Sequence, residues 1–447
     1  MSRRIRVLEV VRPSLGGMKK HVQGLVQGLN RDRFEAFLAA PKDETCIQWA
    51  ARQGVGYVFL EISDRTLSLS DATACLKLRK LIRAIQPDIC HFHGFKAAAI
   101  GRVAVALCFF AQVTNCEVAD ALVDDAETAS HEVSNAMVDR CPAADTEIAP
   151  RVVYTVHNSV LSRSGMHLSA ANASAASPTT FYSSAFLGKM CLYAERALAR
   201  FTHLVITVSK ALHQEYSAIS GLGPGKVRHI PNGIDLERFL EIRSPDSQHP
   251  VSTKRDMGCA AKTQVVGLVS RLIPHKGVKT FLLAIFSLGR MGFTPQVIIA
   301  GDGPFRDELE AFAAELGLGD QVRFLGFIED MVSFYSALDV FVLSSFSEGM
   351  PLSVIEAMAS GVPVVATRTG GVEEVVMPGA GRLVPPGDPE SMAACIRDAL
   401  LYPEESRIFA DRARLHAGEN FSLEEMIRKT EEVYEEVLTC PGSKTYH

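Results

Sequence analysis

The chain has 447 residues, 47% of them apolar and 22% charged, and these proportions indicate a soluble globular protein long enough for two domains with separate cores. Its net charge of −5 argues against nucleic acid as a main partner, since proteins that neutralise phosphates are usually basic. Ten cysteines occur without a C-x-x-C pair, so neither a zinc cluster nor a thioredoxin-like site is indicated, and reduced thiols in the cytosol are expected.

Short apolar runs alternate with helical patterns in the N-terminal half, which favours an α/β domain with a parallel sheet. The first run contains charged residues and has no small-residue cleavage site, so it predicts a strand and not a signal peptide. The longest apolar run, Ala97–Val113, carries Arg102 and is too short to span a bilayer comfortably. The expected strands are Ile5–Val11, Ala36–Ala40, Tyr57–Leu60, Ile89–His91, Val152–Thr155, Leu204–Val208 and Val227–Ile230.

Polar or glycine-rich turns follow three of these strands. Gly16-Gly17 would let backbone N–H groups approach a phosphate or an acceptor closely, although an ordinary loop is the alternative. His93 and His157 stand where two further strands end. A single histidine at a strand end is more often structural than catalytic, but two strand ends that face one cleft favour a functional role for at least one of them.

An acidic segment, Glu117–Glu147, interrupts the alternation. It holds nine acidic residues and one arginine, a net charge of −8, so the rest of the chain carries +3. This composition predicts a solvated or disordered insertion on the surface of the first domain.

The second half repeats the α/β pattern. Residues 240–262, rich in proline, serine and charge, have no clean period and are predicted to be a linker. Two Rossmann-like halves joined there would place a ligand cleft between the carboxyl ends of both sheets. The expected strands are Val265–Ser270, Gln296–Ala300, Val322–Phe324, Val340–Leu343, Val364–Ala366 and Arg382–Val384.

Basic residues follow the first of these strands. Arg271 and Lys276 could neutralise a diphosphate, because arginine offers a bidentate fork and lysine a compact charge. The next strand ends in Gly301-Asp302-Gly303-Pro304, which lacks the G-x-G-x-x-G fingerprint and so counts against a nicotinamide enzyme.

The most informative stretch is Ser347–Glu356, where an apolar run ends at a Gly/Pro turn and a helical pattern begins. Glu348 is expected in the loop and Glu356 in the helix, on the order of 10 Å apart, with unpaired helix N–H groups between them. This arrangement suits a diphosphate flanked by two sugars. Solvated glutamates at a helix end are the alternative.

Ser347–Glu356, with Gly361-Val362-Pro363-Val364-Val365-Ala366 and Gly370-Gly371-Val372-Glu373-Glu374 after it, resembles the retaining glycosyltransferases of family 4 (group 1), which have the GT-B fold. The resemblance covers nearly the whole chain except the acidic segment and the tail. It implies two Rossmann-like domains that face each other across a cleft. Residues 1–239 would form the acceptor-side domain, 263–422 the nucleotide-sugar-binding domain, and 423–447 a helix that crosses back, followed by a tail.

Carried over residue by residue, the resemblance implies two catalytic residues. His157 would orient the donor sugar, and Glu348 would hold sugar hydroxyls and support positive charge at the anomeric carbon. Arg271 and Lys276 would hold the diphosphate, and Glu356 the ribose hydroxyls. The other implied donor-binding residues are Gly17, Ile328, Gly349, Met350 and Leu352, with Gly16 and His93 on the acceptor side.

The implied donor is a nucleoside diphosphate sugar, such as a UDP sugar, and the acceptor a glycan, a lipid-linked compound or a small molecule. No cofactor and no metal ion are expected, because cationic side chains and helix N–H groups can stabilise the leaving diphosphate. A cytoplasmic location is expected, with peripheral contact at the inner face of the membrane left open. Two alternatives also stay open: a sugar-nucleotide epimerase of the same fold, and an inactive nucleotide-sugar-binding protein.

Overall fold

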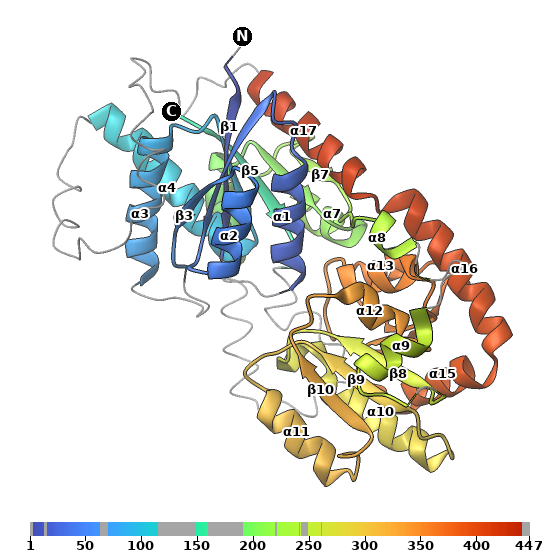
Figure 1. Cartoon of the computed structure of the whole chain (residues 1–447). Coiled ribbons are helices and arrows are strands. Elements are labelled where there is room, and N and C mark those ends of the chain that lie inside the picture. The colour runs from blue at the N-terminus through green and yellow to red at the C-terminus, as the bar shows by residue number, and fades with distance from the viewer. Residues whose placement is uncertain are drawn as a thin grey trace.

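The computed structural model describes residues 3–12, 16–62, 70–114, 149–159, 191–219, 221–240, 242, 249–260 and 262–439. These residues form two α/β domains, one above the other in Figure 1, and the first and last described segments both belong to the first domain. The acidic segment 117–147 and the predicted tail beyond residue 439 lie outside the described residues.

The first domain is built on a seven-stranded parallel sheet in the order β3-β2-β1-β4-β5-β6-β7. Its strands are nearly continuous apolar runs because helices cover both faces of a parallel sheet. The register places Glu9 of β1 beside His91 of β4, and His93 of β4 beside Thr155 of β5. The strands are β1 (Ile5–Val11), β2 (Phe34–Ala40), β3 (Gly56–Phe59), β4 (Ile89–His93), β5 (Arg151–Val156), β6 (Leu204–Thr207) and β7 (Val227–His229).

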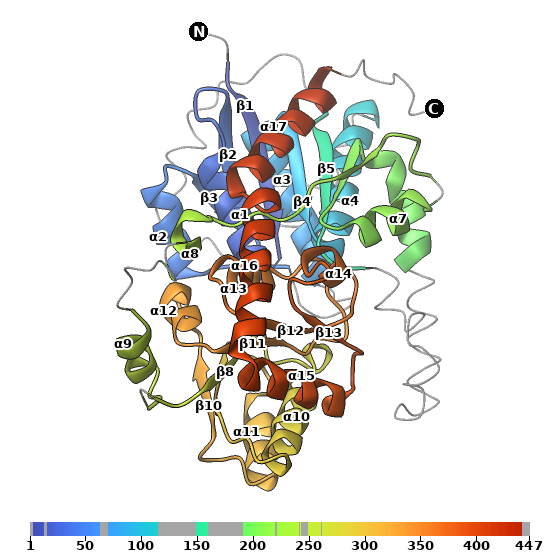
Figure 2. The same ribbon diagram turned by 90° about the vertical axis from the view of Figure 1, so that its right-hand side faces the viewer.

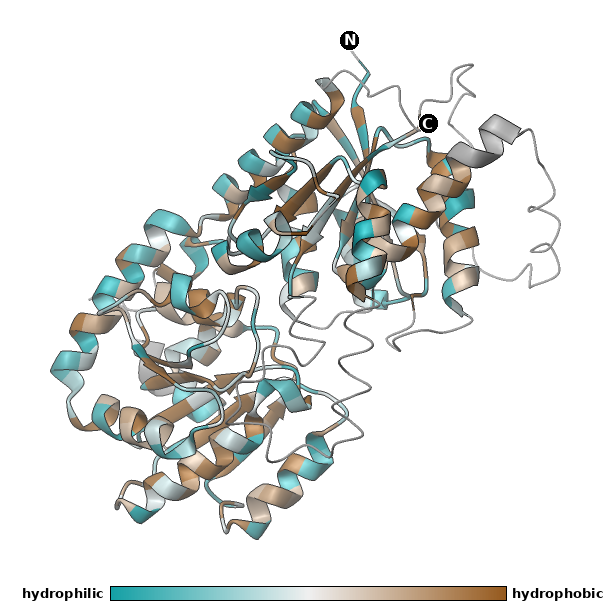
Figure 3. Ribbon diagram, turned by 180° about the vertical axis from the view of Figure 1, so that it is seen from behind, coloured by the Kyte–Doolittle hydropathy of each residue, from teal (hydrophilic) through white to brown (hydrophobic). Residues whose placement is uncertain are grey.

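Helices of this domain begin where its strands end, so their N-termini gather along one edge of the sheet. α1 follows β1 directly, and α4 follows β4. Figure 3 shows strands that are mostly hydrophobic and helices along which hydrophilic and hydrophobic residues alternate. The helices are α1 (Gly17–Gly28), α2 (Glu44–Arg52), α3 (Ser70–Ile85), α4 (Phe95–Thr114) and α7 (Lys210–Ser217), with a short 3₁₀ turn at Ala199–Phe201.

The second domain has a six-stranded parallel sheet in the order β10-β9-β8-β11-β12-β13. Its strands are β8 (Val265–Val269), β9 (Gln296–Ala300), β10 (Val322–Gly326), β11 (Val340–Leu343), β12 (Val364–Thr367) and β13 (Arg382–Val384). Its helices are α10 (Val278–Arg290), α11 (Arg306–Glu315), α12 (Met331–Ser336), α13 (Leu352–Ala359), α14 (Val372–Val375) and α15 (Pro389–Leu401).

The two sheets confirm the predicted GT-B architecture. Each of the thirteen expected strands is present, and no boundary differs by more than two residues from the prediction. β4 is longer than expected, so His93 is the last residue of the strand instead of the loop after it.

The segment 240–262, predicted as a linker, contains the end of α8 (Glu237–Leu240) and all of α9 (His249–Asp256). α9 packs on α12 of the second domain, and Lys254 at its end lies 2.7 Å from a carboxylate oxygen of Asp339. Its sequence, HPVSTKRD, has no apolar period, so it gives no helical signal to pattern analysis.

The chain returns to the first domain through two consecutive helices, α16 (Pro403–Asn420) and α17 (Leu423–Thr439). α16 packs on α13 of the second domain and α17 on α1 and β5 of the first, and Figure 2 shows them running along both domains. A Cβ at Gly28 would collide with Ile427, so this glycine allows α1 and α17 to approach closely. The crossing helix expected from the resemblance is therefore confirmed.

Candidate functional site

The carboxyl ends of both sheets face one cavity of about 1530 Å³ between the domains. Side chains or backbone after β1, β4 and β5 line it on one side, and residues after β8, β9, β10 and β11 on the other. This is the place where ligands bind in open α/β sheets. Eleven of the predicted site residues line it: Gly16, Gly17, His157, Arg271, Lys276, Ile328, Glu348, Gly349, Met350, Leu352 and Glu356.

Glu348 is paired with a lysine at the bottom of the second-domain wall. Lys276 Nζ lies 2.6 Å from Glu348 Oε1, and the hydroxyl of Ser345 donates to the same oxygen at 2.6 Å. Gly277 allows the loop after β8 to approach the loop after β11 closely. It adopts φ 65°, and a Cβ there would collide with the carbonyl oxygen of Ser344. Lys276 and Glu348, both of them predicted site residues, therefore form one ion pair at the cavity.

Glu356 is paired with a lysine from the other domain. Its side chain is 5% exposed, and its Oε1 lies 2.7 Å from Nζ of Lys20 on α1. The hydroxyl of Tyr335 donates to Oε2 at 2.9 Å. Burial raises the pKa of Tyr335 well above its ordinary value, and the nearby carboxylate raises it further. The tyrosine therefore stays a hydrogen-bond donor to Glu356.

The glycine after Glu348 forms a close contact between the domains. A Cβ at Gly349 would collide with the carbonyl oxygen of His157, so only glycine fits there. Next to it, Asn232 donates from Nδ2 to the carbonyl oxygen of Met350 at 3.0 Å. Asn232 belongs to the turn 231–233, which carries the chain towards the second domain. These contacts bring the backbone of His157 against Gly349, the residue after Glu348.

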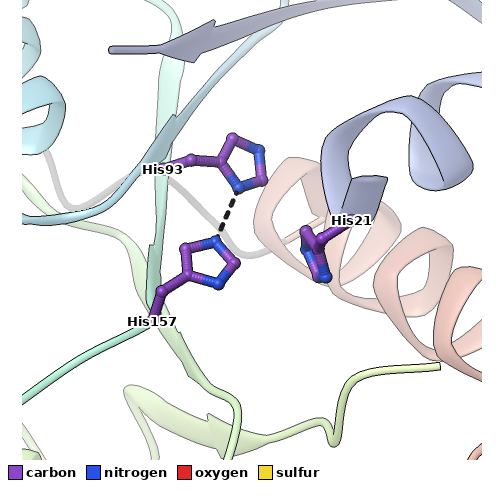
Figure 4. A group of neighbouring side chains, drawn as sticks. All are labelled: His21, His93 and His157. Atoms are coloured by element: carbon purple, nitrogen blue, oxygen red, sulfur yellow. Dashed lines mark hydrogen bonds between the residues drawn. The ribbon is translucent and has the colours of Figure 1, made fainter. Parts of the chain in front are cut away.

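The first-domain wall presents one histidine to the cavity and keeps others behind it. His157 lines the cavity, whereas His93 is fully buried and lies behind, its Nδ1 3.2 Å from His157 Nε2 (Figure 4). His21 of α1 packs edge-on against His157, with ring centroids 4.7 Å apart. The structure thus places the expected acceptor-side residue His93 in contact with His157 and not among the residues that line the cavity.

These imidazoles are held in their neutral form. Burial lowers the pKa of His157 well below its ordinary value, and the neighbouring histidines lower it further. Burial likewise lowers the pKa of His93 to about 4 and that of His21 to about 3, with repulsion from nearby histidines adding to each. A neutral imidazole has one donor and one acceptor nitrogen, so the wall offers hydrogen bonds and not positive charge.

Three residues of the site were not predicted. Lys20 lies three residues after Gly17 on α1, a spacing that keeps it on one helix face, and this spacing was the signal that could have found it. Tyr335 had no such signal, because its partner Glu356 lies on another helix. Asn232 stands in the turn Ile230–Asp235, which resembles the family's interdomain turn and favoured a hinge role over a chemical one.

Two groups among the described residues have nitrogen or oxygen atoms close enough to hold a metal ion. They are His21, His93 and His157, and Glu9, His91 and His93, with atoms within 4.8 Å of one another in each. In both groups these atoms also form hydrogen bonds with each other, for example between His93 Nε2 and Glu9 Oε2 at 2.7 Å. A search of the described helices for one that is long and apolar enough to cross a bilayer finds none.

Two family models match the chain. One, described as a glycosyl transferase 4-like domain, matches residues 16–233, and the other, described as glycosyl transferases group 1, matches residues 253–416. The first match spans the first domain and the second most of the second domain.

Curated relatives match over part of their length. A GDP-mannose-dependent alpha-(1-6)-phosphatidylinositol monomannoside mannosyltransferase of Mycolicibacterium smegmatis is 30% identical over 237 residues, 51% of this chain and 60% of the relative. A D-inositol 3-phosphate glycosyltransferase of Corynebacterium jeikeium is 33% identical over 224 residues, 47% of this chain and 52% of the relative. The chain thus spans about half to three fifths of these relatives.

Solved structures share the fold over nearly the whole chain. Anabaena HepE in complex with UDP and glucose superposes with a TM-score of 0.71 and 21% identity, covering 97% of this chain and 100% of that one. Sucrose-phosphate synthase from Thermosynechococcus elongatus gives 0.71 and 19%, covering 98% and 100%. At this identity the likeness shows a common fold.

Proposed function

Because the chain belongs to the group 1 glycosyltransferases, also called family 4, we propose that it moves a sugar from a nucleoside diphosphate sugar to an acceptor, with retention at the anomeric carbon. One observation carries the proposal: a single cavity holds two lysine–carboxylate pairs, Lys276–Glu348 and Lys20–Glu356, opposite the neutral His157. The HepE complex with UDP and glucose supports a nucleotide sugar as donor. The family matches do not favour the epimerase or the inactive binding protein.

The diphosphate is assigned to the cationic side of the cavity. Lys276 has three N–H donors and gives one to Glu348, so two remain for phosphate oxygens. Arg271 lines the same cavity and can offer a bidentate fork. Together they would stabilise the negative charge that develops on the leaving group, and this supports transfer without a metal ion.

Glu356 is assigned to the ribose. Its two oxygens offer about four lone-pair sites, and Lys20 and Tyr335 each use one. The others can accept hydrogen bonds from ribose hydroxyls. Because the carboxylate is almost fully buried, these bonds would be shielded from competing water.

Glu348 and His157 are assigned to the transferred sugar, since both line the cavity where the two domains meet at Gly349. Glu348 would accept from sugar hydroxyls and support positive charge at the anomeric carbon, and His157 would orient the sugar from the first-domain wall. Lys276 and Ser345 bind Oε1 of Glu348 and so fix the carboxylate in place, and we assign it no covalent intermediate.

The cavity has room for an acceptor with a hydrocarbon part. Its volume of about 1530 Å³ exceeds the roughly 300–1,000 Å³ of a typical small-molecule site. On the first-domain side it continues along α3 and α4, where Leu76, Phe95, Val103 and Leu107 line it. Among the acceptor classes we therefore propose a lipid-linked one, which would bring the protein to the cytoplasmic face of a membrane.

A donor screen tests the proposal. UDP and GDP sugars are each offered with and without short-chain lipid and soluble sugar acceptors, and released nucleotide and glycosylated product are measured. We expect one nucleotide to bind in the micromolar range and turnover to require its sugar. The proposal fails if every donor is inert while the nucleotides bind, and its acceptor part fails if only soluble acceptors are glycosylated.

A further inference from the structure

A chain of buried polar groups runs from the cavity wall to the crossing helix α17. It joins His157, His93, Glu9, His91 and Tyr434, and we call it the buried histidine chain. Glu9, His91 and His93 come from neighbouring strands β1 and β4, whose register places them side by side. Its members behind His157 are 0% exposed, so solvent water cannot take the place of any of their hydrogen-bond partners.

Glu9 is the anchor of this chain. Its Oε2 lies 2.7 Å from His93 Nε2 and 3.1 Å from His91 Nδ1, and its Oε1 accepts from the hydroxyl of Tyr434 at 2.6 Å. Burial works to raise the pKa of Glu9, but attraction and hydrogen bonds from His91 and His93 outweigh it and lower the pKa. The group is therefore a carboxylate, which can only accept hydrogen bonds.

Glu9, in the middle of the chain, decides the proton positions between itself and the cavity. Because Glu9 cannot donate, the proton of neutral His93 is on Nε2, and its Nδ1 carries a lone pair. The 3.2 Å contact between His93 Nδ1 and His157 Nε2 then requires His157 to donate from Nε2. Neutral His157 is left with a lone pair on Nδ1, the nitrogen on the far side of its ring from His93 (Figure 4).

We propose that Glu9 is a positioning residue that acts through His93 to fix His157 in the Nε2–H tautomer, so that His157 Nδ1 accepts a hydrogen bond from a hydroxyl of the bound sugar. The identity of that ligand rests on the proposed function, whereas the tautomer follows from the protein's own contacts. With the opposite tautomer, His157 would present an N–H donor to the cavity and would require an acceptor atom there.

Tyr434 and His91 hold Glu9 in place. Tyr434 donates to Glu9 while its oxygen lies 2.6 Å from His91 Nδ1, and His91 Nε2 lies 2.7 Å from the hydroxyl of Thr155. Tyr434 belongs to α17, so the helix that joins the domains also contacts the group that orients the site histidine.

Nitrogen NMR of the intact protein with ¹⁵N-labelled histidine tests the tautomer directly. The His157→Gln and His93→Gln spectra assign the two signals by their loss. In the unsubstituted protein at neutral pH we expect a protonated Nε2 and an unprotonated Nδ1 for both residues. A protonated Nδ1 on either residue overturns the proposal, and this measurement does not depend on any variant of Glu9 folding or on turnover.

Glu9→Gln tests the cause. An amide at this position can donate as well as accept, so the chain can reverse and His157 should populate the Nδ1–H tautomer. We expect kcat to fall by about tenfold to a hundredfold while nucleotide affinity stays within about twofold. Tyr434→Phe is the matched control, because it removes another hydrogen bond to the same carboxylate and leaves the Glu9–His93 bond. It should keep the Nε2–H tautomer of His157. Its loss of kcat should be at least tenfold smaller than that of Glu9→Gln.

Two further outcomes would overturn the proposal. One is a Glu9→Gln protein with an unchanged His157 tautomer. The other is a stoichiometric zinc ion in the purified protein that is lost in His21→Gln, since a metal held by His21, His93 and His157 would replace the hydrogen bond between the last two. If the tautomer is as expected but no donor is turned over, the proposed function fails and the assignment of Glu9 stands.

Discussion

The two walls of the cavity hold their polar groups in different ways. On the second-domain wall, Glu348 and Glu356 pair with lysines whose side chains are 19% and 44% exposed. On the first-domain wall, His157 bonds to a buried imidazole that is itself bonded to a buried carboxylate. The lysines can therefore rearrange around an incoming charged group, whereas the histidine is already fixed by the fold.

This difference suggests a division of labour. Because the lysines keep part of their surface in solvent and have N–H donors to spare, they can turn towards a phosphate without leaving the carboxylates unpaired. A fully buried hydrogen-bonded chain is rigid, because each group that lost its partner would be left unsatisfied. We therefore expect substitutions on the second wall to change binding and catalysis. Substitutions on the first wall should also lower the free energy of unfolding.

The largest effect is expected from Glu348→Gln. The change removes the charge that faces the anomeric carbon but keeps the shape, so turnover should fall by about 10²-fold or more with the fold intact. Steady-state kinetics and UDP or GDP calorimetry would show a loss in kcat with little change in nucleotide affinity. Glu308→Gln is the control, since this carboxylate also pairs with a lysine, Lys279, but on the exposed surface. Near-normal turnover in the Glu348 variant would remove it from the mechanism.

A second, smaller effect is expected in nucleotide binding. Lys276→Ala should weaken UDP or GDP binding by about 10- to 100-fold, because a hydrogen bond to a charged group contributes about 1.5–3 kcal/mol. Lys279→Ala, three residues along the chain and away from the cavity, should leave the affinity unchanged. Arg271→Ala should resemble Lys276→Ala. Calorimetry with equal affinities in all of these variants would place the phosphates elsewhere.

The first wall should be visible in the pH dependence of stability. His21 and His93 have pKa values lowered to about 3 and about 4, whereas an unfolded histidine titrates near 6.5. Between these values the unfolded state binds more protons, so the free energy of unfolding falls as pH falls from about 6.5 to about 4. Each histidine that titrates fully contributes on the order of 2–3 kcal/mol to this loss.

Urea unfolding at pH 7, 6 and 5 measures this slope. His203 offers a comparison outside the site, because burial, with repulsion from Arg151 and Lys226, lowers its pKa to about 4 and its Nδ1 accepts from the backbone N–H of Val152. His203→Asn should reduce the dependence of the free energy of unfolding on pH by the contribution of one histidine. It should leave turnover unchanged. A free energy of unfolding that is constant from pH 7 to pH 5 would show that the buried histidines are not held neutral.

The fold could be predicted because its signals are local. Apolar runs such as Val340–Leu343 identify strands, and the turn after that run with the following helical pattern located Glu348 and Glu356. α9 escaped prediction because it has no apolar period, and its ordering depends on tertiary contacts such as Lys254 with Asp339.

The rest of the site could not be predicted because its contacts are long-range. The bond from Tyr434 to Glu9 joins residues 425 apart, and the one from Lys20 to Glu356 joins residues 336 apart. Pattern analysis placed Glu9 only as a charge inside a strand. The structure shows why a charge can be buried there, since three donors from β4 and α17 surround it.

The smallest effect is expected from metal removal. On the second wall, Arg271 and Lys276 already offer positive charge to the leaving diphosphate, so a divalent cation has no further role there. On the first wall, the ring nitrogens of His21, His93 and His157 lie close enough to hold a metal ion. However, His93 Nδ1 and His157 Nε2 are already hydrogen-bonded to each other. EDTA should therefore leave both donor affinity and turnover unchanged, and added Mg²⁺ or Mn²⁺ should not raise either.

Activity that EDTA abolishes and Mg²⁺ or Mn²⁺ restores would place the metal at the diphosphate. Loss that only Zn²⁺ reverses would place it at the histidines, and would mean that the first wall, like the second, works through charge.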